Sequence, residues 1–134
     1  MRINLFSKSR SFGSTNTNLS SSEVMDLGIL GLQRIRSEKN QSLELKLQNF
    51  ALLYTELIAD NSVDKQKLLT KIAKLKQDLS KSAQSLKVSV SLDNAVNGIA
   101  AALEYIKAYP SDKENNRVLL ILNLVFSTQQ LNIN

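Results

Sequence analysis

The 134-residue chain contains no histidine, cysteine or tryptophan, only one proline and only four glycines. Without histidine it lacks an imidazole general base and the usual nitrogen ligand of zinc and non-haem iron sites. Without cysteine it lacks thiolate nucleophiles, iron–sulfur ligands and disulfides, so its composition is compatible with reducing and oxidising compartments alike. The four glycines are too scattered to form a phosphate-binding glycine loop.

Carboxylates and lysines remain as the groups that could support catalysis. Acid–base catalysis by carboxylates needs two acids whose surroundings separate their pKa values, and no close pair of acids falls on an expected apolar face. The acids that do cluster are Asp60 with Asp64 and Asp112 with Glu114. Both clusters stand where helices are expected to begin, and acids there cap backbone amides. We therefore expect a non-enzymatic protein with no cofactor and no metal.

Residues 1–22 differ in composition from the rest of the chain. Serine, threonine and asparagine dominate this segment, and Arg2, Lys8 and Arg10 give it a charge of +3 with no acid. It lacks the continuous apolar stretch of a secretory signal peptide. A flexible tail without a targeting role, an export signal like those of bacterial effectors and an organelle transit segment all fit this composition. The expected organisation is a flexible basic tail over 1–22 and a single helical domain over 23–134, made in the cytoplasm and open to export or organelle targeting.

Two apolar patterns after the tail predict helices. Ser20 and Glu23 have the spacing of a capping box, and an apolar face with two glycines follows over residues 24–35. The glycines of that face favour close packing against a neighbouring helix. A second face alternates spacings of four and three over Leu43, Leu47, Phe50, Tyr54 and Leu57, as in a packed helix pair. Because residues 36–41 contain no helix breaker, 22–59 is either one long bent helix or two helices.

Residues 60–62 predict the end of the helix that carries Leu43 to Leu57. A third helix follows over residues 63–87, with apolar residues again at spacings of four and three. Two such helices joined by a short turn predict an antiparallel helical hairpin. Residues 86–92 alternate apolar and polar side chains, which fits a short strand or an extended connector, and we favour the connector. Ser91 or Asp93 is then expected to cap a fourth helix that ends at Tyr109, because a proline follows.

The capping-box spacing of residues 111–114 predicts the start of a fifth helix. Residues 118–126 are apolar except for Asn123, and nine residues are too few to span a bilayer. A helix that is apolar on all sides is either the central helix of the fold or a surface that a partner covers.

The positive charge of the chain is concentrated in residues 63–87, which carry seven lysines, two aspartates and a net charge of +5. On a helical wheel Lys67, Lys71, Lys74 and Lys81 follow one flank of the apolar face. Such lysines could be the solvated rim of a helix contact, or could attract an acidic protein, or could attract the phosphates of nucleic acid or lipid. The helix has no arginine or aromatic side chain for reading bases, which makes nucleic acid the less favoured partner.

Together these patterns predict an all-α bundle of four to five helices with a long central antiparallel hairpin and a flexible N-terminal tail. The leading functional hypothesis is a protein–protein interaction module, such as a small bacterial adaptor, secreted effector or secretion-associated subunit. A self-assembling subunit and a nucleic-acid or anionic-surface binder that uses residues 63–87 are the alternatives. The partner is then another protein or a second copy, and no membrane span is expected. The expected contact residues are Leu43, Leu47, Phe50, Tyr54, Leu57, Leu119, Leu120, Leu122, Val125 and Phe126, with Lys67, Lys71, Lys74 and Lys81 as the anionic contact.

Overall fold

The computed structural model of the chain describes residues 19–60, 64–112 and 114–133, with side chains up to Phe126. These residues form five α-helices and no strand, which confirms the all-α prediction. The helices are α1 (Ser21–Ser37), α2 (Gln41–Ile58), α3 (Lys65–Leu86), α4 (Ser89–Ala108) and α5 (Asn116–Ile133). The predictions made for residues 1–18 lie outside the described part of the chain.

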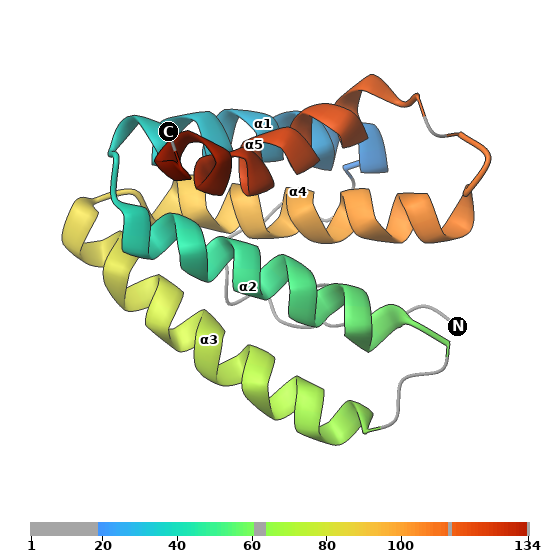
Figure 1. Cartoon of the computed structure of the whole chain (residues 1–134), viewed down its shortest axis with the longest axis horizontal. Helices are drawn as coiled ribbons and strands as arrows, with labels where there is room; N and C mark the ends of the chain where they lie inside the picture. Colours follow the sequence, from blue (N-terminus) through green and yellow to red (C-terminus); the bar gives the residue numbers. More distant parts are fainter. Residues whose placement is uncertain (1–18, 61–63, 113, 134) are drawn as a thin grey trace.

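The helices pack in two groups (Figure 1). Helices α1 and α4 run antiparallel to each other, and α5 packs on both of them. Helices α2 and α3 form the expected antiparallel hairpin on the other side of α4, and α3 lies at the edge of the bundle. Buried apolar side chains from all five helices form one core.

Glycines allow α1 and α4 to approach to backbone contact. A Cβ atom placed on Gly28 would lie 2.6 Å from the Cα atom of Gly98, and one placed on Gly31 would lie 2.4 Å from the carbonyl oxygen of Ser91. Only a residue without a side chain fits such an approach. The expected close packing of the glycine-bearing helix is therefore confirmed, and α4 is the helix that it packs against.

Capping hydrogen bonds and one left-handed residue define the ends of the first two helices. The Ser20–Glu23 capping box is present, with the Glu23 amide donating to Ser20 Oγ at 3.2 Å and the Ser20 amide donating to Glu23 Oε1 at 2.9 Å. The interpretation of 22–59 as one long helix is wrong. Lys39 adopts a left-handed conformation (φ 55°), and the Asn40 side chain caps α2 by accepting from the Leu43 amide at 2.9 Å. Asparagine is a strong N-cap and needs no glycine or proline to start a helix.

Residues 86–92 are neither a strand nor an extended connector. Helix α3 continues to Leu86 and α4 begins at Ser89, so only Lys87 and Val88 join them. Lys87 turns the chain by adopting a left-handed conformation (φ 60°). Ser91 and Asp93 lie inside α4 and do not cap it. The alternating pattern arose because two helices meet there at a tight turn, and period-two spacing across such a junction resembles a strand.

The fifth helix begins later than expected. Helix α4 ends before Tyr109 as Pro110 predicts, but residues 111–114 do not open α5. The Asn115 side chain caps the helix instead, accepting from the Val118 amide at 3.1 Å. Asp112 accepts a hydrogen bond from the Tyr105 hydroxyl at 2.5 Å, so its carboxylate is bonded to a side chain of α4.

Candidate functional site

The apolar face of α2 is occupied by the chain's own core. Leu43, Phe50 and Tyr54 are fully buried, and Leu47 and Leu57 are no more than 2% exposed. Tyr54 also donates a hydrogen bond to the Glu104 carboxylate of α4. The sequence prediction placed these five residues at a partner interface. The structure instead places them inside the bundle, where they leave no exposed surface for another protein.

Helix α5 contributes one face to the core and turns another face outward. Val118, Ile121 and Val125 are buried, whereas Leu119 is 44% exposed and Leu120 is 40% exposed. Leu122 and Phe126 are half-buried against the edge of the core. The helix is therefore not the central helix of the fold but an outer one. Of the five contact residues expected here, Val125 belongs to the core and Leu119 and Leu120 are the most accessible.

The outward direction of Leu119 and Leu120 follows from helix geometry. Successive residues are rotated by about 100° around a helix, which places both leucines on the side opposite Val118, Ile121 and Val125. The exposed residues Asn116 and Asn123 share that side. The two leucines thus form a small apolar surface, which we call the α5 leucine face, between two asparagines.

Polar contacts fix the position of α5 on α1. Arg117 Nε lies 2.7 Å from the Asp26 carboxylate near the start of both helices. Further along, Arg36 Nη1 donates to the carbonyl oxygen of Leu124 at 3.1 Å. These two contacts require α1 and α5 to run in the same direction, as Figure 1 shows. The α5 leucine face is consequently held in one orientation by the fold.

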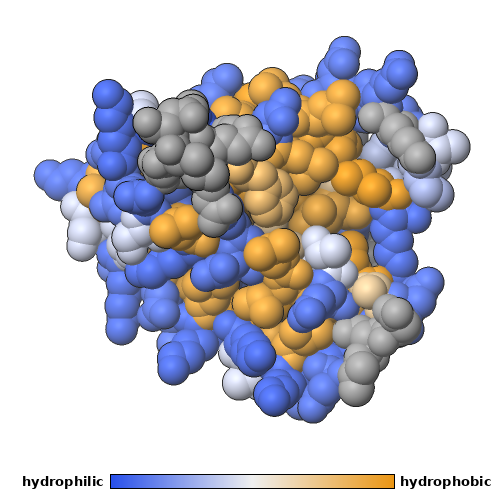
Figure 2. All heavy atoms as spheres, viewed as in Figure 1, coloured by the Kyte–Doolittle hydropathy of each residue, from blue (hydrophilic) through white to orange (hydrophobic). Residues whose placement is uncertain are grey.

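Apolar atoms gather over α5 and extend towards α2 on the face shown in Figure 2. Exposed leucines on neighbouring helices add to the apolar surface of the molecule, with Leu30 of α1 61% exposed and Leu52 of α2 57% exposed. Single exposed leucines are common in soluble proteins, but contiguous apolar surface marks interaction sites. Two helices each expose a pair of leucines, Leu119 and Leu120 on α5 and Leu27 (36% exposed) and Leu30 on α1.

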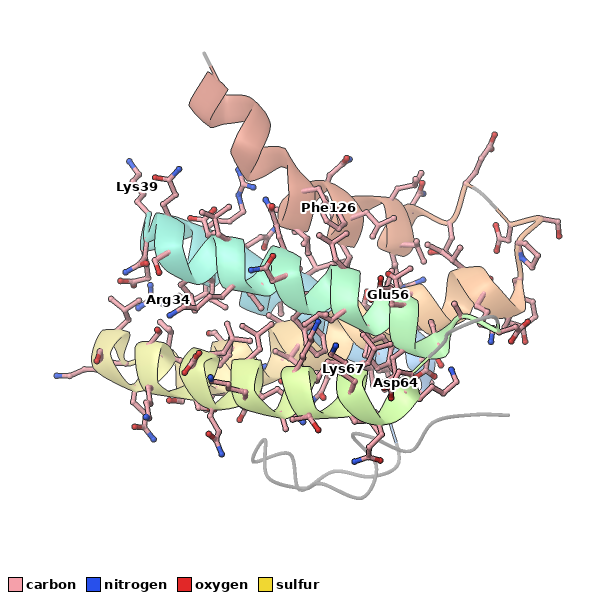
Figure 3. All side chains as sticks on the ribbon, turned by 60° about the horizontal axis from the view of Figure 1, so that its bottom comes forward. Arg34, Lys39, Glu56, Asp64, Lys67 and Phe126 are labelled. Carbon is pink, nitrogen blue, oxygen red and sulfur yellow. The ribbon has the colours of Figure 1, made fainter. Side chains whose placement is uncertain are left out.

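The lysines of α3 separate into two groups. Lys67, Lys71, Lys74 and Lys81 are exposed. Lys65 is exposed as well, but its Nζ atom donates to the carbonyl oxygens of Leu57 at 2.5 Å and Ala59 at 3.1 Å. These hydrogen bonds connect the start of α3 to the end of α2. Figure 3 shows Lys67 beside the start of α3 and charged side chains projecting from α3 away from the bundle. The four lysines expected to bind an anionic partner are therefore on the surface.

Lys76 and Asp93 form a half-buried pair between α3 and α4. Burial lowers the pKa of Lys76 to about 8, although the Asp93 charge opposes this shift. Burial also raises the pKa of Asp93 to about 6, against the effect of Lys76. The folded protein thus favours the neutral form of each group. Asp93 therefore contributes a loss in the free energy of unfolding as pH rises from about 4 to about 6, and Lys76 contributes a gain between about 8 and about 10.5.

Three buried or paired polar groups lie outside the patterns that sequence reasoning used. Gln48 is only 5% exposed, and its Nε2 atom has no hydrogen-bond partner within the described part of the chain. Its place three residues before Ala51, beside the apolar face of α2, is the only sequence signal for this burial. Asp60 accepts from Lys107 Nζ at 2.7 Å, and this hydrogen bond lowers the pKa of the Asp60 carboxyl. No sequence pattern connects residues so far apart.

The described residues contain no group of three or more acidic side chains arranged to hold a metal ion. None of their helices combines the length and the apolar character that a membrane crossing needs. Comparison of the chain with family models, curated proteins and solved structures finds no match. The described residues present two candidate contact surfaces, the α5 leucine face and the exposed lysines of α3.

Proposed function

We propose that the protein is a non-enzymatic helical interaction module that binds another protein through the α5 leucine face. The observation that supports this proposal is the exposure of Leu119 and Leu120 on a helix whose opposite side is packed into the core. Full burial of a leucine side chain contributes about 2 kcal/mol relative to leaving it exposed. Covering these two residues, each already about half covered, would contribute about 2 kcal/mol in total.

The surroundings of the α5 leucine face also favour a protein partner. Leu122 and Phe126 are half-buried beside it and offer further apolar contact. Asn116 and Asn123 supply amide groups at its edge. An apolar centre with a polar rim is the usual composition of a protein interface. A small bacterial adaptor, a secreted effector or a secretion-associated subunit would use such a surface, and a self-assembling subunit would place a second copy on it.

Photo-cross-linking in the native cell tests this proposal. A photoreactive phenylalanine analogue replaces Leu119 in one variant and Leu120 in another, and the exposed Asn49 of α2 is replaced in a control variant. Because all three positions are on the surface, the substitutions leave the core intact. We expect irradiation to give the same discrete adduct from both α5 positions, with the attached protein identified by mass spectrometry.

The outcomes distinguish the versions of the proposal. An adduct with one other protein supports an adaptor, effector or secretion-associated subunit, and an adduct of twice the chain mass supports self-assembly. An adduct of equal yield at Asn49 would show unspecific contact, and the absence of any adduct at 119 and 120 would leave the α5 leucine face without a partner. Either of these results would contradict the proposal.

A further inference from the structure

The exposed lysines of α3 form a straight ridge. Lys67, Lys74 and Lys81 recur every seven residues and stand about 10 Å apart along the helix axis, because each residue advances it by about 1.5 Å. Seven residues are close to two helical turns, so the three side chains point in nearly the same direction. Lys71 stands beside them on the same flank. We call these four residues the lysine ridge.

The charges of the lysine ridge are not neutralised by the fold. None of its four lysines makes an ion pair with another residue in the described ranges, whereas Lys65 and Lys76 are engaged with the rest of the bundle. Two aspartates lie on this segment. Asp64 uses its carboxylate to cap α3, accepting from the Lys67 amide at 3.0 Å. Asp78 lies on the same side of the helix as the ridge, four residues after Lys74 and three before Lys81, so the four lysines and the two aspartates together keep a net charge of +2.

The side chains between the lysines distinguish a phosphate ligand from an acidic protein. Thr70, Gln77 and Gln84 are exposed along the ridge, and no large apolar side chain shares that side. Protein interfaces are centred on apolar and aromatic anchors and are depleted in lysine. Binding to a nucleic-acid backbone needs only positive charge, because the release of counterions from the phosphates drives it. The composition of the ridge therefore favours phosphates.

The packing of α3 also distinguishes a duplex from a membrane. An amphipathic helix binds a membrane by inserting its apolar side below the headgroups. The apolar side of α3 is unavailable for insertion, since Leu68, Ile72 and Leu79 are buried in the core. A duplex carries a phosphate charge about every 1.7 Å of its axis, so lysines spaced about 10 Å apart along a helix can each reach a phosphate.

From these observations we propose that the lysine ridge binds the phosphate backbone of double-stranded nucleic acid without reading its sequence. Lysine contacts phosphate as a point charge, and the ridge carries no arginine for bidentate contacts to guanine. Three to four phosphate contacts predict weak, salt-dependent binding. The proposal is independent of the α5 leucine face, which lies on another helix.

Fluorescence anisotropy of a labelled duplex of about 20 base pairs tests the lysine ridge. With about three phosphate contacts, the affinity of the full chain should fall about 40-fold between about 50 mM and about 200 mM KCl. The variant K67Q/K74Q/K81Q should lose most of its affinity at low salt and most of its salt dependence. The control variant R2Q/K8Q/R10Q removes the same charge from the N-terminal segment and should bind like the unmodified chain.

Each other outcome overturns the proposal. The lysine ridge is not the site if the two triple variants bind equally, or if no binding occurs at low salt. Tighter binding to vesicles with anionic headgroups would show that the ridge binds membranes instead. Tighter binding to polyglutamate than to the duplex would show that it binds an acidic protein. Circular dichroism of K67Q/K74Q/K81Q should match that of the unmodified chain, because all three lysines are exposed.

Discussion

Replacing Gly28 by alanine tests how α1 and α4 pack. The new methyl carbon would lie 2.6 Å from Gly98 Cα and 3.2 Å from the carbonyl oxygen of Asn94. Carbon atoms in contact normally stand about 3.5–4.0 Å apart, so the helices would have to separate by about 1 Å. Both neighbours are backbone atoms of α4, and no change of rotamer can move them away.

Two opposing effects determine how much Gly28→Ala changes the free energy of unfolding. Overpacking of a core typically costs about 1–3 kcal/mol, and a clash with backbone belongs at the upper end of that range. Alanine is favoured over glycine within a helix by about 1 kcal/mol. The expected net loss in the free energy of unfolding is therefore about 2 kcal/mol, with a fall in Tm of roughly 8 °C for a chain of this size.

Chemical denaturation followed by circular dichroism measures this loss. Gly31→Ala should behave in the same way, because its Cβ atom would lie 2.4 Å from the carbonyl oxygen of Ser91. Ser85→Ala, on the exposed side of α3, is the control for helix propensity alone and should be neutral or slightly stabilising. If Gly28→Ala stabilised the protein by about 1 kcal/mol, as an exposed helical glycine would, the close α1–α4 contact would be refuted.

Three further predictions concern buried polar groups and a helix end. Gln48→Met should raise the free energy of unfolding by about 1 kcal/mol, because it removes a buried donor without a partner, and a loss in urea denaturation would contradict this. Between about pH 4 and pH 6 the unmodified chain should lose about 1–2 kcal/mol of stability that Asp93→Asn keeps, because burial raises the pKa of Asp93 to about 6 in the folded state. Equal pH profiles of the two proteins would exclude that burial effect. Lys87→Gly should gain about 0.5–1 kcal/mol, since glycine adopts the left-handed conformation without steric cost, and a lower Tm would argue against the αL cap.

The parts of the fold that follow from local rules could be predicted from the sequence. The capping box at Ser20, the cap at Asp64 and the end of α4 before Pro110 depend on residues close together in the chain. The apolar faces of α2 and α3 likewise predicted their antiparallel pairing. Local capping signals and helix periodicity therefore predicted these helix ends and the α2–α3 hairpin.

The tight turns could not be predicted because their residues are not typical of turns. Lys39 and Lys87 adopt left-handed conformations that usually belong to glycine. With no glycine or proline nearby, the chain appeared continuous at Lys39 and extended after Lys87. The surrounding packing determines these conformations, and it is not visible in a local pattern.

The structure departs from the expected contact surface on α2, where burial depends on contacts between distant helices. The face with the most regular apolar spacing, Leu43 to Leu57, predicted a contact correctly, but the partner is the chain's own core. Periodicity shows that a face is covered and cannot show which molecule covers it. The helical wheel grouped the four residues of the lysine ridge correctly, whereas the contacts of Lys65 and Lys76 depend on the positions of α2 and α4.

We propose that the α5 leucine face binds another protein. The dissociation constant of the complex with the protein captured by cross-linking at Leu119 and Leu120 tests this proposal most directly. The variant L119S/L120S should weaken binding about 30-fold, equivalent to about 2 kcal/mol. The control Val90→Ser changes an exposed apolar residue at the start of α4 and should bind within about twofold of the unmodified chain. If L119S/L120S bound as tightly as Val90→Ser, the α5 leucine face would not be the interaction surface.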